Sequence, residues 1–199
     1  MNKESRPQQT QSPAPSGQQS SLEEANPAAT AEAFIASART FLSEEYLPKI
    51  ERCLEQLSEE DVWWRGAEES NSIGNLILHL SGNARQWIVS GVGGAPDTRA
   101  RQQEFDRRAG IGRAELLATL RDTLAEVDAV LQRVDPARLQ ERRSIQGHDV
   151  TIIQAIFHVV EHFAMHTGQI ILLTKLLAKK DLAFYDFSSG APAPTWRRD

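Results

Sequence analysis

The feature that most restricts the fold of this sequence is a long helical pattern near its carboxyl end. The pattern begins at Asp149 or Val150 and ends near Lys179, and a helix of this length would extend about 45 Å. Asp149 and Thr151 are candidate capping residues for its start. Because the pattern is apolar on most sides, the helix is expected to be largely buried among other helices.

Three further helical patterns precede it, at residues 31–57, 72–90 and 112–134. Each places apolar residues at intervals of three and four, which is the spacing of one face of a helix. Pro48 falls inside the first pattern and is expected to kink or break that helix near Leu47, since proline has no backbone N–H to donate. Four amphipathic helices joined by loops predict an all-α protein, a four-helix bundle.

The composition divides the chain into one folded domain and two tails. Residues 1–29 are rich in Gln, Ser and Pro and are predicted to be a disordered tail, because they contain almost nothing to bury. Residues 30–187 form the predicted bundle, and residues 188–199 a C-terminal tail. Two polar connectors are expected within the bundle, an Arg-rich one at 97–110 and one at 140–149 with room for a short extended piece.

Charge and cysteine content exclude several classes of protein. The formal net charge is −5, which argues against nucleic-acid binding because a basic face is needed to neutralise phosphates. No apolar run approaches the roughly 20 residues of a membrane span, and no signal peptide is indicated, so a cytoplasmic protein without membrane contact is expected. The single cysteine, Cys53, matches no motif and is expected to pack as a small apolar side chain.

The histidines carry the strongest functional signal. His158, His162 and His166 are spaced one turn apart on one face of the last helix, and His79 lies in an apolar run of the second. The outer two of the three would be about 12 Å apart along the axis, so only an adjacent pair can bind one ion. That pair and His79 would form a three-nitrogen site with an open position, as in catalytic zinc centres, although imidazole also suits nickel, iron and copper.

Two other interpretations of these histidines are weaker. Each could be a core residue satisfied by a hydrogen bond, but three at helical spacing with a fourth on another apolar helix favour a metal site. His158, Glu161 and His162 also match the H-x-x-E-H pattern of inverted zinc proteases. That pattern is short, and too little chain follows it to supply a further carboxylate ligand and a substrate chamber.

Two spaced motifs resemble the DinB/YfiT-like superfamily. One comprises Asn71–Leu76 with His79–Asn83, and the other is Glu161–Ile170. The resemblance covers residues 30–187, and the two motifs together are far more specific than either alone. It implies an up-up-down-down four-helix bundle, often a homodimer, that binds a divalent metal, usually zinc or nickel.

The resemblance also implies which residues hold the metal. The matching positions are His79, His162 and His166, which leaves His158 as an alternative ligand or a core histidine. Asn75 and Asn83 lie one turn from His79 on either side, where they either orient it or form helix-packing hydrogen bonds. Glu161 and Gln169 are candidate supporting residues in the last helix, as a base or as partners of the ligands.

The Arg-rich connector offers a candidate anion site. Arg99 and Arg101 could bind the carboxylates of a thiol cofactor, because Arg recognises carboxylates through two parallel hydrogen bonds. The alternative, which we favour, is that these arginines form ion pairs with Glu104 and Asp106 of the same connector.

The resemblance leaves three functional hypotheses. The first is a thiol S-transferase, in which a metal-bound low-molecular-weight thiol attacks a small-molecule substrate. The second is a metal-dependent hydrolase that uses the same open position for water. The third is a non-catalytic module that binds a metal or a small ligand.

Overall fold

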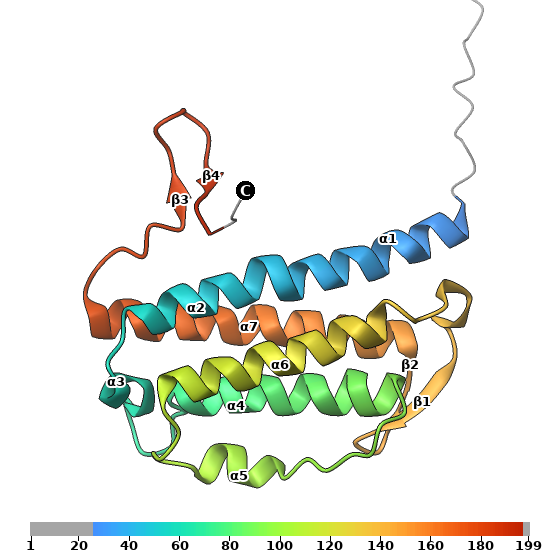
Figure 1. The fold of residues 1–199 in the computed structure, drawn as a ribbon, viewed down its shortest axis with the longest axis horizontal. Helices are drawn as coiled ribbons and strands as arrows, with labels where there is room; N and C mark the ends of the chain where they lie inside the picture. The colour runs from blue at the N-terminus through green and yellow to red at the C-terminus, as the bar shows by residue number, and fades with distance from the viewer. Residues whose placement is uncertain (1–25, 197–199) are drawn as a thin grey trace, which may run out of the picture.

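The computed structural model describes residues 26–196, and its first long helix is continuous (Figure 1). The helix consists of α1 (Pro27–Thr40), a π-helical segment (Phe41–Tyr46) and α2 (Leu47–Glu55). Of the kink or break expected near Leu47, the break does not occur, and the helix instead changes there from π-helical to α-helical. The wider π-helical turns precede the proline and give its ring the space that an α-helical carbonyl would occupy.

The second long helix is α4 (Ile73–Ala84), which continues through a π-helical segment (Arg85–Val92). Ser72 caps its start, and the side chain of Asn75 bonds back to the Ser72 backbone. The short helix α3 (Glu59–Trp63) precedes it and packs closely against it. A Cβ atom at Gly74 would lie 2.9 Å from the Trp63 ring, so glycine permits this contact.

The connection between α4 and the third long helix, α6 (Arg113–Leu131), is a crossover that we define as residues 93–112. It contains a helix, α5 (Arg101–Asp106), where the sequence predicted only a polar connector. Six mostly polar residues contain no apolar stripe that could have indicated a helix. Tertiary contacts hold it instead, because the Asn75 side-chain amide donates to the carbonyl oxygens of Glu104 (2.7 Å) and Arg107 (2.9 Å).

A hairpin leads into the last long helix. After a 3₁₀ turn (Pro136–Arg138), strands β1 (Arg142–Ile145) and β2 (His148–Thr151) pair antiparallel, and α7 (Ile152–Ala178) follows directly. The polar connector at 140–149 is therefore largely this hairpin. Thr151 caps α7, as expected, and Gln154 completes the capping box.

The four long helices surround one apolar core. Ile50, Ile77, Leu120 and Phe163, one from each long helix, have no exposed surface. The predicted all-α four-helix bundle is confirmed. Among the described residues, none of the helices combines the length and apolar character needed to cross a membrane.

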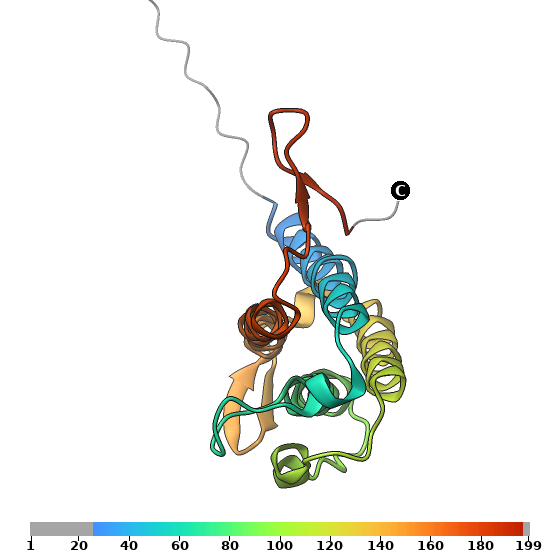
Figure 2. The ribbon, with the colours of Figure 1, turned by 90° about the vertical axis from the view of Figure 1, so that its left-hand side faces the viewer.

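The helix directions specify how the up-up-down-down bundle that the resemblance implied is arranged. Arg39 pairs with Asp128 and Glu51 with Arg121, so the first long helix runs antiparallel to α6. Helices α4 and α6 run in the same direction because the crossover returns to the end of the bundle where α4 began (Figures 1 and 2). Up-up-down-down therefore describes the order around the bundle, whereas the order along the chain is up-down-down-up.

The chain ends also differ from the predicted tails. Helix α1 begins at Pro27, inside the predicted tail 1–29, and residues 1–25 lie outside the described part. Strands β3 (Tyr185–Asp186) and β4 (Ala193–Pro194) form a second hairpin across the predicted boundary at residue 187. Trp196, which follows it, is buried beneath the Lys49 ammonium, and residues 197–199 lie outside the described part.

Candidate metal centre

Three histidines from two helices meet in the interior of the bundle. His79 on α4 faces His162 and His166 on α7, and one ring nitrogen from each lies within 4.8 Å of the other two. His79 and His166 are buried and His162 is half-buried. The antiparallel packing of α4 on α7 therefore brings together the adjacent pair and the third histidine that the sequence suggested.

The converging nitrogen atoms of this group suit a metal ion. The Nε2 atoms of His79 and His162 are 2.9 Å apart. The Nδ1 atom of His166 is bonded to the side-chain oxygen of Gln169 at 2.6 Å, which leaves its Nε2 buried without a partner. A buried polar atom without a partner is costly, and a metal ion shared with the other two imidazoles would satisfy it.

The surroundings keep the imidazoles of α7 neutral. Burial, together with the nearby His166 and His79, lowers the pKa of His162 to about 3. Burial also lowers the pKa of His166, although the hydrogen bond to the side-chain oxygen of Gln169 opposes this effect. Neutral imidazole is the form that binds metals.

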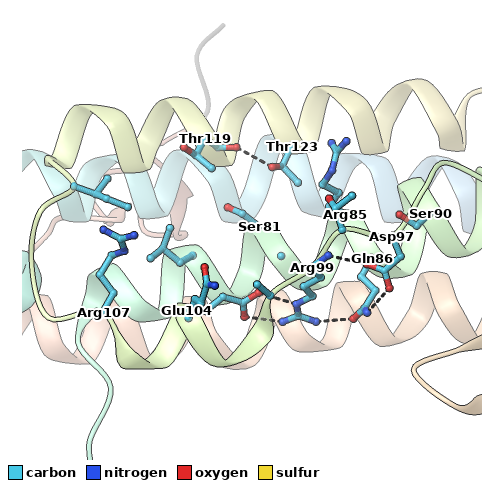
Figure 3. A pocket seen from close by; sticks show the side chains of 16 residues that line it. Ser81, Arg85, Gln86, Ser90, Asp97, Arg99, Glu104, Arg107, Thr119 and Thr123 are labelled. Carbon is cyan, nitrogen blue, oxygen red and sulfur yellow. Dashed lines mark hydrogen bonds and ion pairs between the residues drawn. The ribbon is translucent and has the colours of Figure 1, made fainter.

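Glu104 and Arg99 of the crossover support His79 from outside the bundle. The Oε2 atom of Glu104 is 2.9 Å from Nδ1 of His79, and the Nε atom of Arg99 donates to the other carboxylate oxygen at 2.7 Å. The Arg99 side chain is 4% exposed, and it also donates to Gln86 (Figure 3). Arg99 thus forms the ion pair that was favoured over an anion site.

Sequence reasoning missed the contact between Glu104 and His79. The place of Glu104 in the Arg-rich connector predicts only an ion pair with the nearby arginines. Twenty-five residues separate it from His79, and no local pattern links a crossover to a helix face at that distance. Arg101, the other candidate for anion binding, is exposed, and its guanidinium lies over the ring of Phe105.

The three other candidate supporting residues, Asn75, Gln169 and Glu161, have different surroundings. Asn75 bonds to the start of α4 and to the crossover, which makes it a packing residue for the segment that carries Glu104. Gln169 contacts the ligand candidate His166, as the sequence suggested. Glu161 is exposed on the surface of α7.

His158 continues the row of histidines but belongs to a different cluster. Its Nε2 atom lies 3.2 Å from the side-chain amide of Asn83, and its ring lies against Trp87 with centroids 4.1 Å apart. Burial lowers its pKa, although the carboxylate of Glu161 acts in the opposite direction. Asn83 thus contacts His158 rather than His79.

A cavity of about 310 Å³ lies between α4, α6 and the crossover (Figure 3). Glu104 and Arg99 line it, so their ion pair borders the cavity and also contacts His79. Its wall also includes Arg107, Ser81 and the hydroxyl-bearing residues Thr119 and Thr123 of α6.

Comparisons with known proteins agree with this fold. A conserved protein from Enterococcus faecalis is 15% identical, covers 73% of this chain and 97% of its own, and superposes with a TM-score of 0.60. A DinB-like protein from Bacillus cereus is 18% identical, covers 73% of this chain and 91% of its own, and gives a TM-score of 0.58. No curated protein matches the sequence.

The solved structures establish the fold, and a family model establishes the family. The resemblance to the DinB/YfiT-like superfamily is confirmed in the fold, since a DinB-like protein matches most of the chain. The model described as "Protein of unknown function (DUF1572)" matches residues 29–190. With its DinB-like bundle and a histidine triad between α4 and α7, the chain belongs to the DUF1572 family.

Proposed function

We propose that this protein binds one divalent metal ion through His79, His162 and His166. The observation that carries the proposal is the buried Nε2 atom of His166, which has no protein partner and lies beside the nitrogens of the other two histidines. Three imidazoles form a donor set that suits zinc and nickel, the metals that the resemblance implies.

We further propose that the metal serves catalysis on a small molecule. A divalent ion held by three nitrogens has an open position, where it lowers the pKa of a bound thiol or water. Arg99 and Glu104 line a cavity beside the site, and its volume is within the size range of small-ligand pockets. A thiol S-transferase is the first candidate for the reaction, and a hydrolase is the second.

A non-catalytic binding module is the alternative. The burial of His79 and His166 favours it, because a closed site stabilises a fold without admitting substrate. Removing the metal with a chelator distinguishes a catalytic site from a structural one. Removing the metal from a closed structural site would unfold the protein, whereas an open catalytic site would lose its metal and keep the bundle.

Metal content is the measurement that tests the proposal. Untagged purified protein should contain about one zinc or nickel per chain by mass spectrometry, and the triple variant with Ala at positions 79, 162 and 166 should contain none. A wild-type protein that stays metal-free after reconstitution would contradict the site.

The two neighbouring histidines of α7 provide a sharper comparison. His162→Ala should abolish metal binding, because it removes one of the three converging nitrogens. His158→Ala should leave metal content near the wild-type level, because that ring contacts Asn83 and Trp87. Equal losses in both variants would show that the ligand set is wrong.

We also propose that two copies of the chain associate through α7. Phe157, Met165, Leu172 and Leu176 are each about half exposed or more and follow one outer face of this helix. The apolar residues share this face with one acidic and one basic side chain, Glu161 and Lys175. Antiparallel pairing of two such faces would place opposite charges together, which supports a homodimer.

A further inference from the structure

Nδ1 of His79 has two charged neighbours that favour opposite protonation patterns. The Oε2 atom of Glu104, at 2.9 Å, can only accept a hydrogen bond and therefore favours a proton on Nδ1. The Nη2 atom of Arg99, at 3.1 Å, can only donate and therefore favours a bare Nδ1 with the proton on Nε2. A metal at Nε2 requires the first arrangement, since only an unprotonated nitrogen can bind it.

The structure holds the Glu104 carboxylate firmly in the position that favours the metal-binding form. Arg99 donates to both of its oxygens, at 2.7 and 2.8 Å, and Asn75 fixes its backbone carbonyl. Its side chain is 11% exposed. An acceptor held this rigidly can set both the tautomer and the ring orientation of a histidine.

Helix α4 makes room for this carboxylate with a glycine. A Cβ atom at Gly82 would lie 2.1 Å from Oε1 of Glu104 and 3.0 Å from Nε of Arg99. Any larger residue at Gly82 would displace the ion pair from the helix that carries His79. Residue 82 therefore controls the position of Glu104 although it contacts no histidine nitrogen in the group.

We propose that Glu104 is the positioning residue of the metal centre, accepting the Nδ1–H of His79 so that the Nε2 lone pair faces His162 and His166. The inference rests on the proposed metal site. It gives the crossover a role in metal binding, because the crossover carries the Glu104 carboxylate to His79 inside the bundle.

Zinc affinity, measured by competition with a chromophoric chelator, is the first test. Glu104→Ala should weaken zinc binding by about 10- to 100-fold, the usual cost of losing such a partner. Glu104→Gln keeps an acceptor oxygen but loses the negative charge, so its zinc affinity should fall by less than that of Glu104→Ala. Asp106→Ala, an exposed carboxylate on the same short helix, is the matched control and should bind like wild type.

Gly82→Ala tests the positioning without altering the carboxylate. Alanine has a higher helix propensity than glycine, so the substitution alone would stabilise an exposed helix. At this position Gly82→Ala should weaken zinc binding, as Glu104→Ala does, while the helical circular dichroism signal is retained. Unchanged zinc affinity in both variants, with a wild-type protein that binds zinc, would overturn the inference.

The tautomer of His79 provides a metal-free test. In ¹⁵N-labelled apo protein, long-range ¹H–¹⁵N correlation spectra should show the proton of His79 on Nδ1. In Glu104→Ala it should move to Nε2, because Arg99 remains as a donor toward Nδ1. A proton on Nε2 in the wild type would overturn the inference. Failure of the wild type to bind either zinc or nickel would instead contradict the proposed function and leave this test valid.

Discussion

At the scale of single residues, equal spacing in the sequence does not mean equal roles. His158, His162 and His166 follow each other by one turn, yet only the last two lie in the group with His79. The ring of His158 contacts Asn83 and Trp87, which lie one and two turns beyond His79 on α4 and its π-helical extension. The sequence predicted that one adjacent pair would be used, and the resemblance indicated which pair.

Cys53 provides a prediction at the same scale. Its side chain has no exposed surface, and burial raises the pKa of the thiol to about 11, although a hydrogen bond with Thr174 opposes this effect. Only the thiolate reacts with disulfide reagents, so native protein at pH 8 should react at least about a hundredfold more slowly than protein unfolded in guanidinium. Stopped-flow absorbance with an aromatic disulfide measures both rates. Rapid labelling of the native protein would show that the thiol is accessible.

At the scale of elements, the apolar spacing predicted the long helices well and the short elements poorly. The patterns at 72–90 and 112–134 agree closely with α4 and its π-helical extension and with α6. The helix α5 and the two hairpins bury too little of their own surface to produce a pattern. Contacts with distant residues hold α5 in place instead, such as the hydrogen bonds from Asn75 to the crossover.

The N-cap residue of α7, Thr151, provides a testable prediction at the scale of elements. Thr151 accepts a hydrogen bond from the backbone N–H of Gln154, so Thr151→Ala should lower the free energy of unfolding by about 1 kcal/mol. Thr119→Ala is the matched control, because Thr119 lies exposed within α6 and alanine has the higher helix propensity there. Urea unfolding of both variants measures the difference. A control as unstable as the cap variant would show that the loss does not come from capping.

At the scale of the whole molecule, the outer face of α7 predicts association. Leu172 is 59% exposed on this apolar face, so Leu172→Glu should convert the proposed dimer into a monomer, because association would bury a carboxylate without a partner in the interface of each copy. Sedimentation velocity at several concentrations measures the change. Glu126→Gln, on the surface of α6 away from this face, should leave the mass of the assembly unchanged. A wild-type protein that is monomeric at all concentrations would contradict the proposal.

The sequence by itself determined the four long helices, Thr151 as a candidate cap, and the row of histidines of which one adjacent pair can share an ion with His79. These features depend on local spacing, which the chain carries without reference to its fold. Only the tertiary structure decided the helix directions, the continuity of the first helix through Pro48, and the contact of Glu104 with His79. These features depend on where the crossover returns to the bundle and on which side chains it brings into contact. Contacts between residues far apart in the sequence produce no periodic pattern, so the sequence does not predict them.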